Sequence, residues 1–367
     1  LGQRAVDLIV QRFSEVGMAD GVLTMDAVPF PAGGKTRREA PPRLESGIQP
    51  VGEKGPHVLV SGSYYLDAEE LEFQVRLTDY GTGELVYAFE PVNATRSEVA
   101  EAMVALRERV VAAVGFHWDW RFDARIMNPP SSHDALLRYV EHAGARWGTD
   151  YESAINALTE ALEFDPGFPL ARLALIDAYQ DVGEREQAAQ ELLAAEELRH
   201  EFTAFERIAL DDSRARLSNR RLEALTHKRK LLRMAPHNPL VRFALAFETY
   251  RLNRPRETIE ILEPVLPYES NLYNWWPVGV AWWAHHSLGK HERELEWANL
   301  GLEMFPDVGL FYYGKGAAFA AMGRLDALGQ VIDECTSVQL SESNMNVGRV
   351  MTNVALELRA HGHRQES

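Results

Sequence analysis

Residues 166–200, PGFPLARLALIDAYQDVGEREQAAQELLAAEELRH, decide the fold of this 367-residue chain. Apolar residues recur at helical spacing on both sides of Val182-Gly183, so the stretch predicts two helices joined by a tight turn. An apolar residue followed by a turn residue returns every 34 to 36 residues, at Trp147-Gly148, Val182-Gly183, Leu217-Ser218, Leu252-Asn253, Leu288-Gly289 and Met322-Gly323. Pro166, Pro236 and Pro306 mark the same period at every second repeat. This period predicts stacked helix hairpins, because one hairpin cannot bury its apolar face alone.

The finer positions within each period resemble the tetratricopeptide repeat (TPR) consensus. The second repeat matches it best, with Leu175, Tyr179, Gly183, Ala188 and Ala195 at the expected offsets after Pro166. The third and fourth repeats depart from it, since Ser218 and Asn253 stand in place of the turn glycine. The resemblance covers residues 133–367 and implies an all-α helical solenoid of six or more hairpins that binds proteins or peptides.

Residues 1–117 have a different pattern, which predicts an α+β domain. Its expected elements are a helix over residues 1–16, a short strand at Gly21–Ala27, a Pro/Gly-rich loop over 29–56, strands at His57–Leu66, Leu71–Tyr80 and Glu84–Pro91, and a helix from a Ser97 cap to Val114. A linker is expected over residues 118–132. The run VLVSGSYYLDAEELEFQVRLTDYGTGELVYAFEPV, residues 58–92, resembles the TolB-N/FlgO-like α+β domain. This order of domains resembles the region C-terminal to the kinase domain in some bacterial serine/threonine protein kinases, and the equivalent region of adenylate-cyclase-like and winged-helix regulators.

Composition and charge argue against several classes of partner. The net charge of −16 disfavours nucleic acid, whose phosphates an acidic surface repels. No run of about 18 apolar residues exists, so we expect no membrane span. The single cysteine, Cys335, excludes an internal disulfide and leaves the compartment open. The chain begins at Leu1 without a signal-peptide pattern, so we expect a fragment or a processed form of a longer protein. The resemblance to bacterial regulators implies a bacterial protein, either cytoplasmic or extracytoplasmic.

The sequence does not contain a recognisable catalytic or metal-binding motif. The Gly-rich loop, HRD and DFG motifs of kinases are missing, and no Cys/His spacing suits a metal ion. His285 and His286 are adjacent, so they point to different faces of a helix. We therefore predict a non-enzymatic chain with no catalytic residues, no metal and no cofactor.

Aromatic residues at the expected groove positions indicate a binding site more clearly than any catalytic or metal-binding pattern does. The positions expected to line a TPR groove include Phe243, Phe247, Tyr250, Trp276, Trp283, His286 and Tyr313. An aromatic groove suits an extended peptide or an amphipathic helix. The alternative is that these residues are core, since the stretch Asn271–Ser287 is strongly apolar.

These observations predict a non-enzymatic scaffold or sensor module that binds a protein or peptide through the TPR groove. Two alternatives stay open. In the first, the chain is the regulatory portion of a larger bacterial signalling enzyme, such as a kinase or cyclase. In the second, it is a structural subunit of a large assembly.

Overall fold

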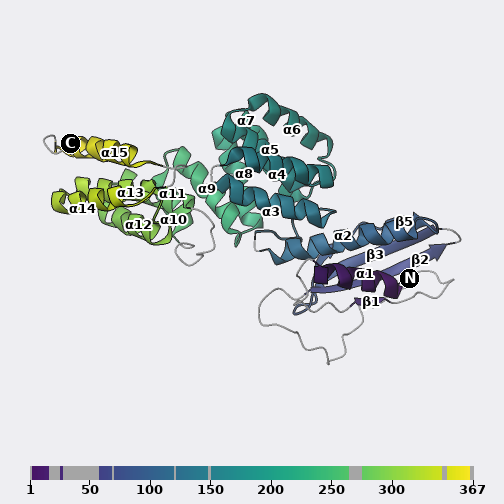
Figure 1. Cartoon of the computed structure of the whole chain (residues 1–367). Coiled ribbons are helices and arrows are strands. Elements are labelled where there is room, and N and C mark those ends of the chain that lie inside the picture. The colour runs from purple at the N-terminus through teal and green to yellow at the C-terminus, as the bar shows by residue number, and fades with distance from the viewer. Residues whose placement is uncertain are drawn as a thin grey trace. The chain divides into compact units, whose positions relative to one another are not determined.

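The computed structural model describes residues 2–15, 25–27, 58–67, 70–119, 121–147, 150–263, 275–340 and 345–363 (Figure 1). The predicted loop over residues 29–56 and most of the strand predicted at Gly21–Ala27 lie outside these ranges. Contacts divide the chain into two units. The first comprises residues 1–142, 155–179 and 186–207, and the second comprises residues 143–154, 180–185 and 208–367. Each unit is described by itself.

The N-terminal part of the first unit is a small sheet with β3 (Glu70–Asp79) at its centre. β2 (Val58–Asp67) and β4 (Leu85–Ala88) pair with β3 in antiparallel fashion, and β1 (Met25–Ala27) pairs with β2 in parallel. The strand predicted at Glu84–Pro91 is shorter than expected, and β5 (Val92–Thr95) was not foreseen. Pro91 has no N–H to donate to the ladder, so pairing stops, and the chain then pairs again with the opposite end of β3.

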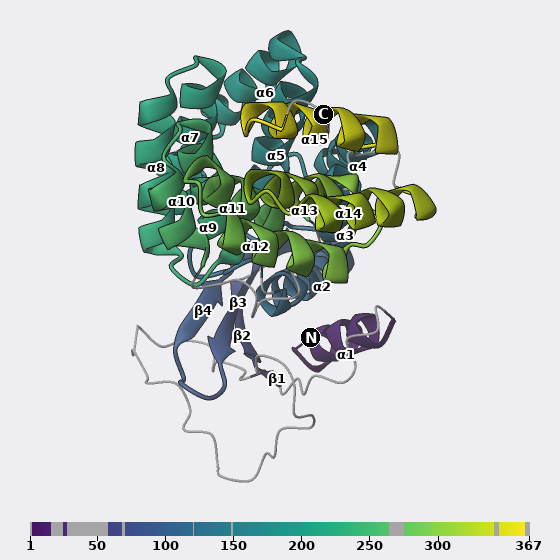
Figure 2. The same ribbon diagram turned by 90° about the vertical axis from the view of Figure 1, so that its left-hand side faces the viewer.

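Two helices pack beside each other on one side of this sheet (Figures 1 and 2). They are α1 (Gly2–Glu15) and α2 (Val99–Trp118). The alternating residues Leu71, Phe73, Val75 and Leu77 of β3 are buried, as a sheet with one covered face requires. The predicted Ser97 cap is wrong, because α2 starts after Glu98, whose carboxylate instead accepts hydrogen bonds from the amide and hydroxyl of Thr95.

The rest of the described chain is helical, and its helices follow one another in six pairs, here called helix–turn–helix segments. These are α3 (His133–Trp147) and α4 (Tyr151–Phe164), α5 (Pro169–Val182) and α6 (Arg185–Glu197), α7 (Ala204–Leu217) and α8 (Arg221–Met234), α9 (Pro239–Arg251) and α10 (Pro255–Leu262), α11 (Trp276–Ser287) and α12 (His291–Met304), and α13 (Gly309–Ala321) and α14 (Leu325–Ser337). A last helix, α15 (Val347–Ala360), follows them. None of the helices in the described ranges combines the length and apolarity that a bilayer crossing needs.

The five turns that the structure describes within these segments repeat one backbone geometry. Gly183, Asn219, Asn253, Gly289 and Gly323 all have positive φ. In the last four of these turns the next amide donates to the carbonyl five residues earlier, as in Arg254 N–H to Thr249 O at 3.0 Å. The left-handed residue of the third turn is Asn219 and not Ser218, because asparagine tolerates this conformation better than serine. The turns predicted from Val182-Gly183 onward therefore terminate helices, whereas Gly148 of the first repeat lies outside the described residues.

Aromatic packing and a buried carboxylate join the expected linker to the helices of the first unit. The rings of Phe116 and Phe122 stack at 4.4 Å, and Tyr139 lies 5.6 Å from Phe122 and 5.1 Å from Phe168. Packing of Phe116 explains why α2 continues to Trp118 and not only to Val114 as predicted. Trp120 lies outside the described residues.

Glu206 of α7 anchors the end of this linker. Its carboxylate is 0% exposed and accepts hydrogen bonds from the backbone amide of Asn128 at 2.6 Å and from Thr203 N–H at 2.8 Å. Burial, opposed by these hydrogen bonds, raises the pKa of Glu206 from 4.5 to about 7.

This carboxyl is expected to make stability depend on pH. Because its pKa is higher in the folded state, the folded chain binds the proton more tightly, and stability falls as pH rises from 5 to 7. The loss amounts to about 2 kcal/mol. The measurement is urea unfolding across this pH range for the wild type and for Glu206→Gln, which has no such titration. A Glu206→Gln chain with the same pH dependence as the wild type contradicts the prediction.

Candidate functional site

The predicted groove residues lie in the second unit, on the first helices of the fourth to sixth helix–turn–helix segments, and they fall into three groups. Phe243 is 8% exposed and belongs to the hydrophobic core. Phe247, Tyr250, Trp276 and Trp283 are partly exposed and contact one another. His286 and Tyr313 contact polar groups from α12 and α15 instead.

The second group is a continuous series of rings from α9 and α11, here called the aromatic row. Phe247 meets Trp276 edge-on at 5.8 Å, and Tyr250 stacks on Trp283 at 5.7 Å with 11° between the ring planes. Trp276 and Trp283, two turns apart on α11, lie 6.4 Å from each other. Each ring therefore contacts at least one other ring of the row and keeps part of its surface accessible to solvent.

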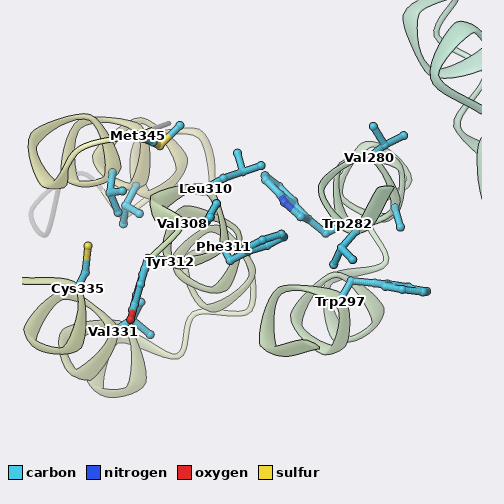
Figure 3. Close-up of a cluster of buried hydrophobic side chains, with 14 of the residues drawn as sticks. Val280, Trp282, Trp297, Val308, Leu310, Phe311, Tyr312, Val331, Cys335 and Met345 are labelled. Carbon is cyan, nitrogen blue, oxygen red and sulfur yellow. The ribbon is translucent and has the colours of Figure 1, made fainter. Parts of the chain in front are cut away.

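The core beneath the row explains why these helices hold their positions. Trp282 is 0% exposed and points from α11 towards Leu310 and Phe311 of α13 (Figure 3). Gly314 lets the indole approach α13, since a Cβ there would lie 3.1 Å from Trp282 Cδ2. Trp282 and Trp283 are adjacent on a helix, so one lies in the core and the other belongs to the row.

The last helix departs from the pattern of the earlier ones. The helices α8, α10 and α12 each pack against the first helix of the next segment, whereas α15 packs mainly against α13 and little against α14. Gly316 of α13 permits this contact, because a Cβ there would lie 2.7 Å from Val354 Cγ2. On α13 the side chains of Leu310, Ala317 and Ala320 are buried, and the predicted groove residue Tyr313 donates a hydrogen bond to Glu357 of α15 at 3.0 Å.

A polar cluster lies where α11, α12 and α15 meet. His286 Nδ1 and His291 Nδ1 are each 2.9 Å from a carboxylate oxygen of Glu294, which is 0% exposed. The hydrogen bond to Glu294 raises the pKa of His286, against the opposing effect of burial. Burial, together with the nearby carboxylate of Glu357, raises the pKa of Tyr313. The neighbouring His285 is buried on the other side of α11, with Nε2 at 3.4 Å from Glu263, so the two adjacent histidines have separate partners as expected.

Sequence reasoning missed Glu294, His291, Glu357 and His361. One signal for Glu294 was present, because it shares a helical face with the apolar residues Trp297, Ala298 and Gly301, all of them buried. A charged residue on an apolar stripe is seldom buried without partners. His291 lies three residues before Glu294 on the same helix and His286 lies eight residues before it, so their spacing was available in the sequence and was overlooked. Glu357 and His361 belong to the last helix and its terminal turn, so spacing gave no sign of them.

Comparisons with known proteins agree with the repeat architecture. Residues 149–205 match the family model described as tetratricopeptide repeat. No curated protein matches the chain.

Solved structures with a similar arrangement include the type IV pilus biogenesis factor PilW, at 14% identity and a TM-score of 0.43 over 57% of this chain and 96% of that one. They also include YrrB, a TPR protein with an unusual peptide-binding site, at 17% identity and a TM-score of 0.38 over 56% of this chain and 98% of that one. A TPR protein from Parabacteroides merdae has 14% identity and a TM-score of 0.37 over 64% and 96% of the two chains. From the repeated turns, the helix order and the family match, the chain carries a TPR-type helical solenoid behind a small N-terminal sheet.

Proposed function

We propose that this chain is a protein- or peptide-binding scaffold and that the aromatic row is its contact surface. The observation that carries this proposal is the row itself. Phe247, Tyr250, Trp276 and Trp283 come from two successive first helices, contact one another ring to ring, and remain partly exposed. Trp and Tyr are enriched at the points that dominate binding energy, because they bury a large area at little cost in side-chain entropy.

The geometry suits a partner that presents apolar side chains at regular intervals. The exposed parts of Trp276 and Trp283 are two helical turns apart along α11. An extended peptide or one face of an amphipathic helix can place successive apolar side chains against such a surface. Arg251, whose guanidinium lies 5.6 Å from the centre of the Phe247 ring, adds a positive charge beside the row.

The test is peptide selection by display against the full chain, followed by measurement of affinity by fluorescence polarisation. Trp283→Ala and Trp276→Ala are each expected to weaken the selected peptide by at least about tenfold, as for residues at the centre of an interface. Leu222→Ala is the matched control, since Leu222 on α8 is 63% exposed and is not part of the row. Selected peptides that bind both tryptophan variants as tightly as the control variant would rule out the row as the contact surface.

The sensor role, the association with a kinase or cyclase, and the role as an assembly subunit are finer hypotheses from the sequence. In the second, a catalytic domain in the same full-length gene is expected, and the row serves to recruit a substrate or regulator. A self-assembling subunit predicts oligomers that grow with concentration in light scattering. The scaffold predicts a monomer that binds peptide with one-to-one stoichiometry.

A further inference from the structure

Three ligand-type side chains converge at the turn between α11 and α12. Glu294 is 0% exposed, and its oxygens lie 2.9 Å from His286 Nδ1 and 2.9 Å from His291 Nδ1. One nitrogen or oxygen atom from each of the three residues lies within 4.8 Å of the other two. The carboxylate thus sits between two imidazole nitrogens, and one cation can take the place of the two bridging protons while keeping the three residues together.

The charge of this cluster is unbalanced. Glu294 and Glu357 both contribute carboxylates, and within the described part of the chain their ion-pair partners are histidines and not lysine or arginine. Burying a carboxylate without full compensation is costly, so a bound divalent cation would stabilise the cluster.

A second layer of groups lies beside the imidazoles. Glu357 Oε1 lies 3.8 Å from His286 Nε2 and accepts a hydrogen bond from Tyr313 at 3.0 Å. The other oxygen, Oε2, lies 3.8 Å from His361 Nε2, and the His361 ring lies edge-on to His291 at 5.6 Å. A carboxylate at the outer nitrogen of a histidine is the usual partner of a metal-binding imidazole, where it fixes the ring and strengthens the ligand.

We propose that His286, His291 and Glu294 bind a divalent transition-metal ion of the Zn²⁺ class, with Glu357 as the group that orients His286. Two imidazoles and a carboxylate select Zn²⁺, Ni²⁺ or Cu²⁺ over Mg²⁺ or Ca²⁺, which prefer oxygen ligands. The ion joins α11 to α12 directly, and Glu357 connects the ligand His286 to α15. The site is therefore a metal-dependent tie beside the surface proposed for peptide binding, and it does not depend on that proposal.

The experiment uses the full chain, freed of metal with EDTA and titrated with Co²⁺ by visible absorption and with Zn²⁺ by calorimetry. One equivalent of either ion is expected to bind, and one equivalent of Zn²⁺ is expected to raise the Tm. His291→Gln keeps a hydrogen-bond donor but not the imidazole, and is expected to weaken Zn²⁺ binding at least about 100-fold. Glu357→Gln retains all three ligands and is expected to weaken it about tenfold. His237→Gln is the matched control, because His237 is exposed in a loop away from the cluster.

The outcomes separate a metal site from a plain hydrogen-bonded network. Absence of stoichiometric Co²⁺ binding by the wild type, or equal Zn²⁺ affinity in His291→Gln and His237→Gln, overturns the proposal. If circular dichroism shows that His291→Gln is not folded, the Zn²⁺ affinity of Glu357→Gln tests the proposal instead. A Zn²⁺ affinity of Glu357→Gln equal to that of the wild type would then show that the ion binds elsewhere.

Discussion

Replacing Trp282 with alanine is expected to destabilise the chain by about 3–5 kcal/mol, the range for removing a large buried aromatic side chain. Trp282 has the largest of the fully buried side chains in the described residues, at 0% exposure. It fills the space between α11 and α13, where Gly314 leaves no side chain of its own to replace it. The cavity would therefore not close by small rearrangements, and the loss is expected to reach the upper part of this range.

The measurement is urea unfolding followed by circular dichroism, which does not depend on tryptophan emission. Trp282→Phe is the informative comparison, because the indole N–H of Trp282 has no hydrogen-bond partner among the described residues. Phenylalanine keeps most of the ring volume and removes an unsatisfied donor, so we expect a loss of about 1 kcal/mol. Equal losses for Trp282→Ala and Trp282→Phe would show that ring volume is not what holds α11 against α13.

The second large effect is expected at Gly301, which lies on the buried face of α12. A Cβ at this position would lie 2.2 to 2.5 Å from three ring carbons of Phe311, and Phe311 is 0% exposed. The ring has no room to retreat, so Gly301→Ala must separate α12 from α13. We expect a destabilisation of about 3 kcal/mol, at the high end for overpacking.

The chain offers a matched control in Gly329, which is an exposed helical glycine on α14. A Cβ there meets nothing within 4 Å. Because alanine restricts the unfolded chain more than glycine does, Gly329→Ala is expected to stabilise by about 0.5–1 kcal/mol. If α12 and α13 approach closely, the free energy of unfolding falls in Gly301→Ala and rises in Gly329→Ala when both are measured in the same assay. A stabilising Gly301→Ala would refute that approach.

The repeat architecture was predictable because it depends on local chemistry repeated along the chain. Gly183, Gly289 and Gly323 end helices in left-handed turns, and asparagine at 219 and 253 replaces glycine without loss of the turn. A left-handed turn depends on the type of a single residue, so glycine and asparagine at these positions reveal the helix ends in the sequence. The order of strands around β3 was less accessible, because it depends on where the chain resumes pairing after Pro91.

The site was predictable only in part. The helical positions of the seven groove residues followed from the repeat period, but their exposure did not. Phe243 is buried while Phe247, one turn later on α9, belongs to the aromatic row. Tyr313 hydrogen-bonds to Glu357, and α15 lies against α13 in a way that the period does not predict. The predicted domain boundaries, with an array over 133–367, and the groove as a binding site stay predictions.

By itself the sequence determined that a small sheet is followed along the chain by stacked hairpins of helices, since periodic turns and apolar stripes are encoded within each repeat. Only the tertiary structure decided which apolar side chains of the repeats stay exposed to solvent and which polar side chains contact one another. His286 and Glu357 are 71 residues apart in sequence, yet His286 Nε2 lies 3.8 Å from Glu357 Oε1. The reason is physical, because contacts between helices depend on how α15 packs against α13, and no local pattern along either helix specifies that packing.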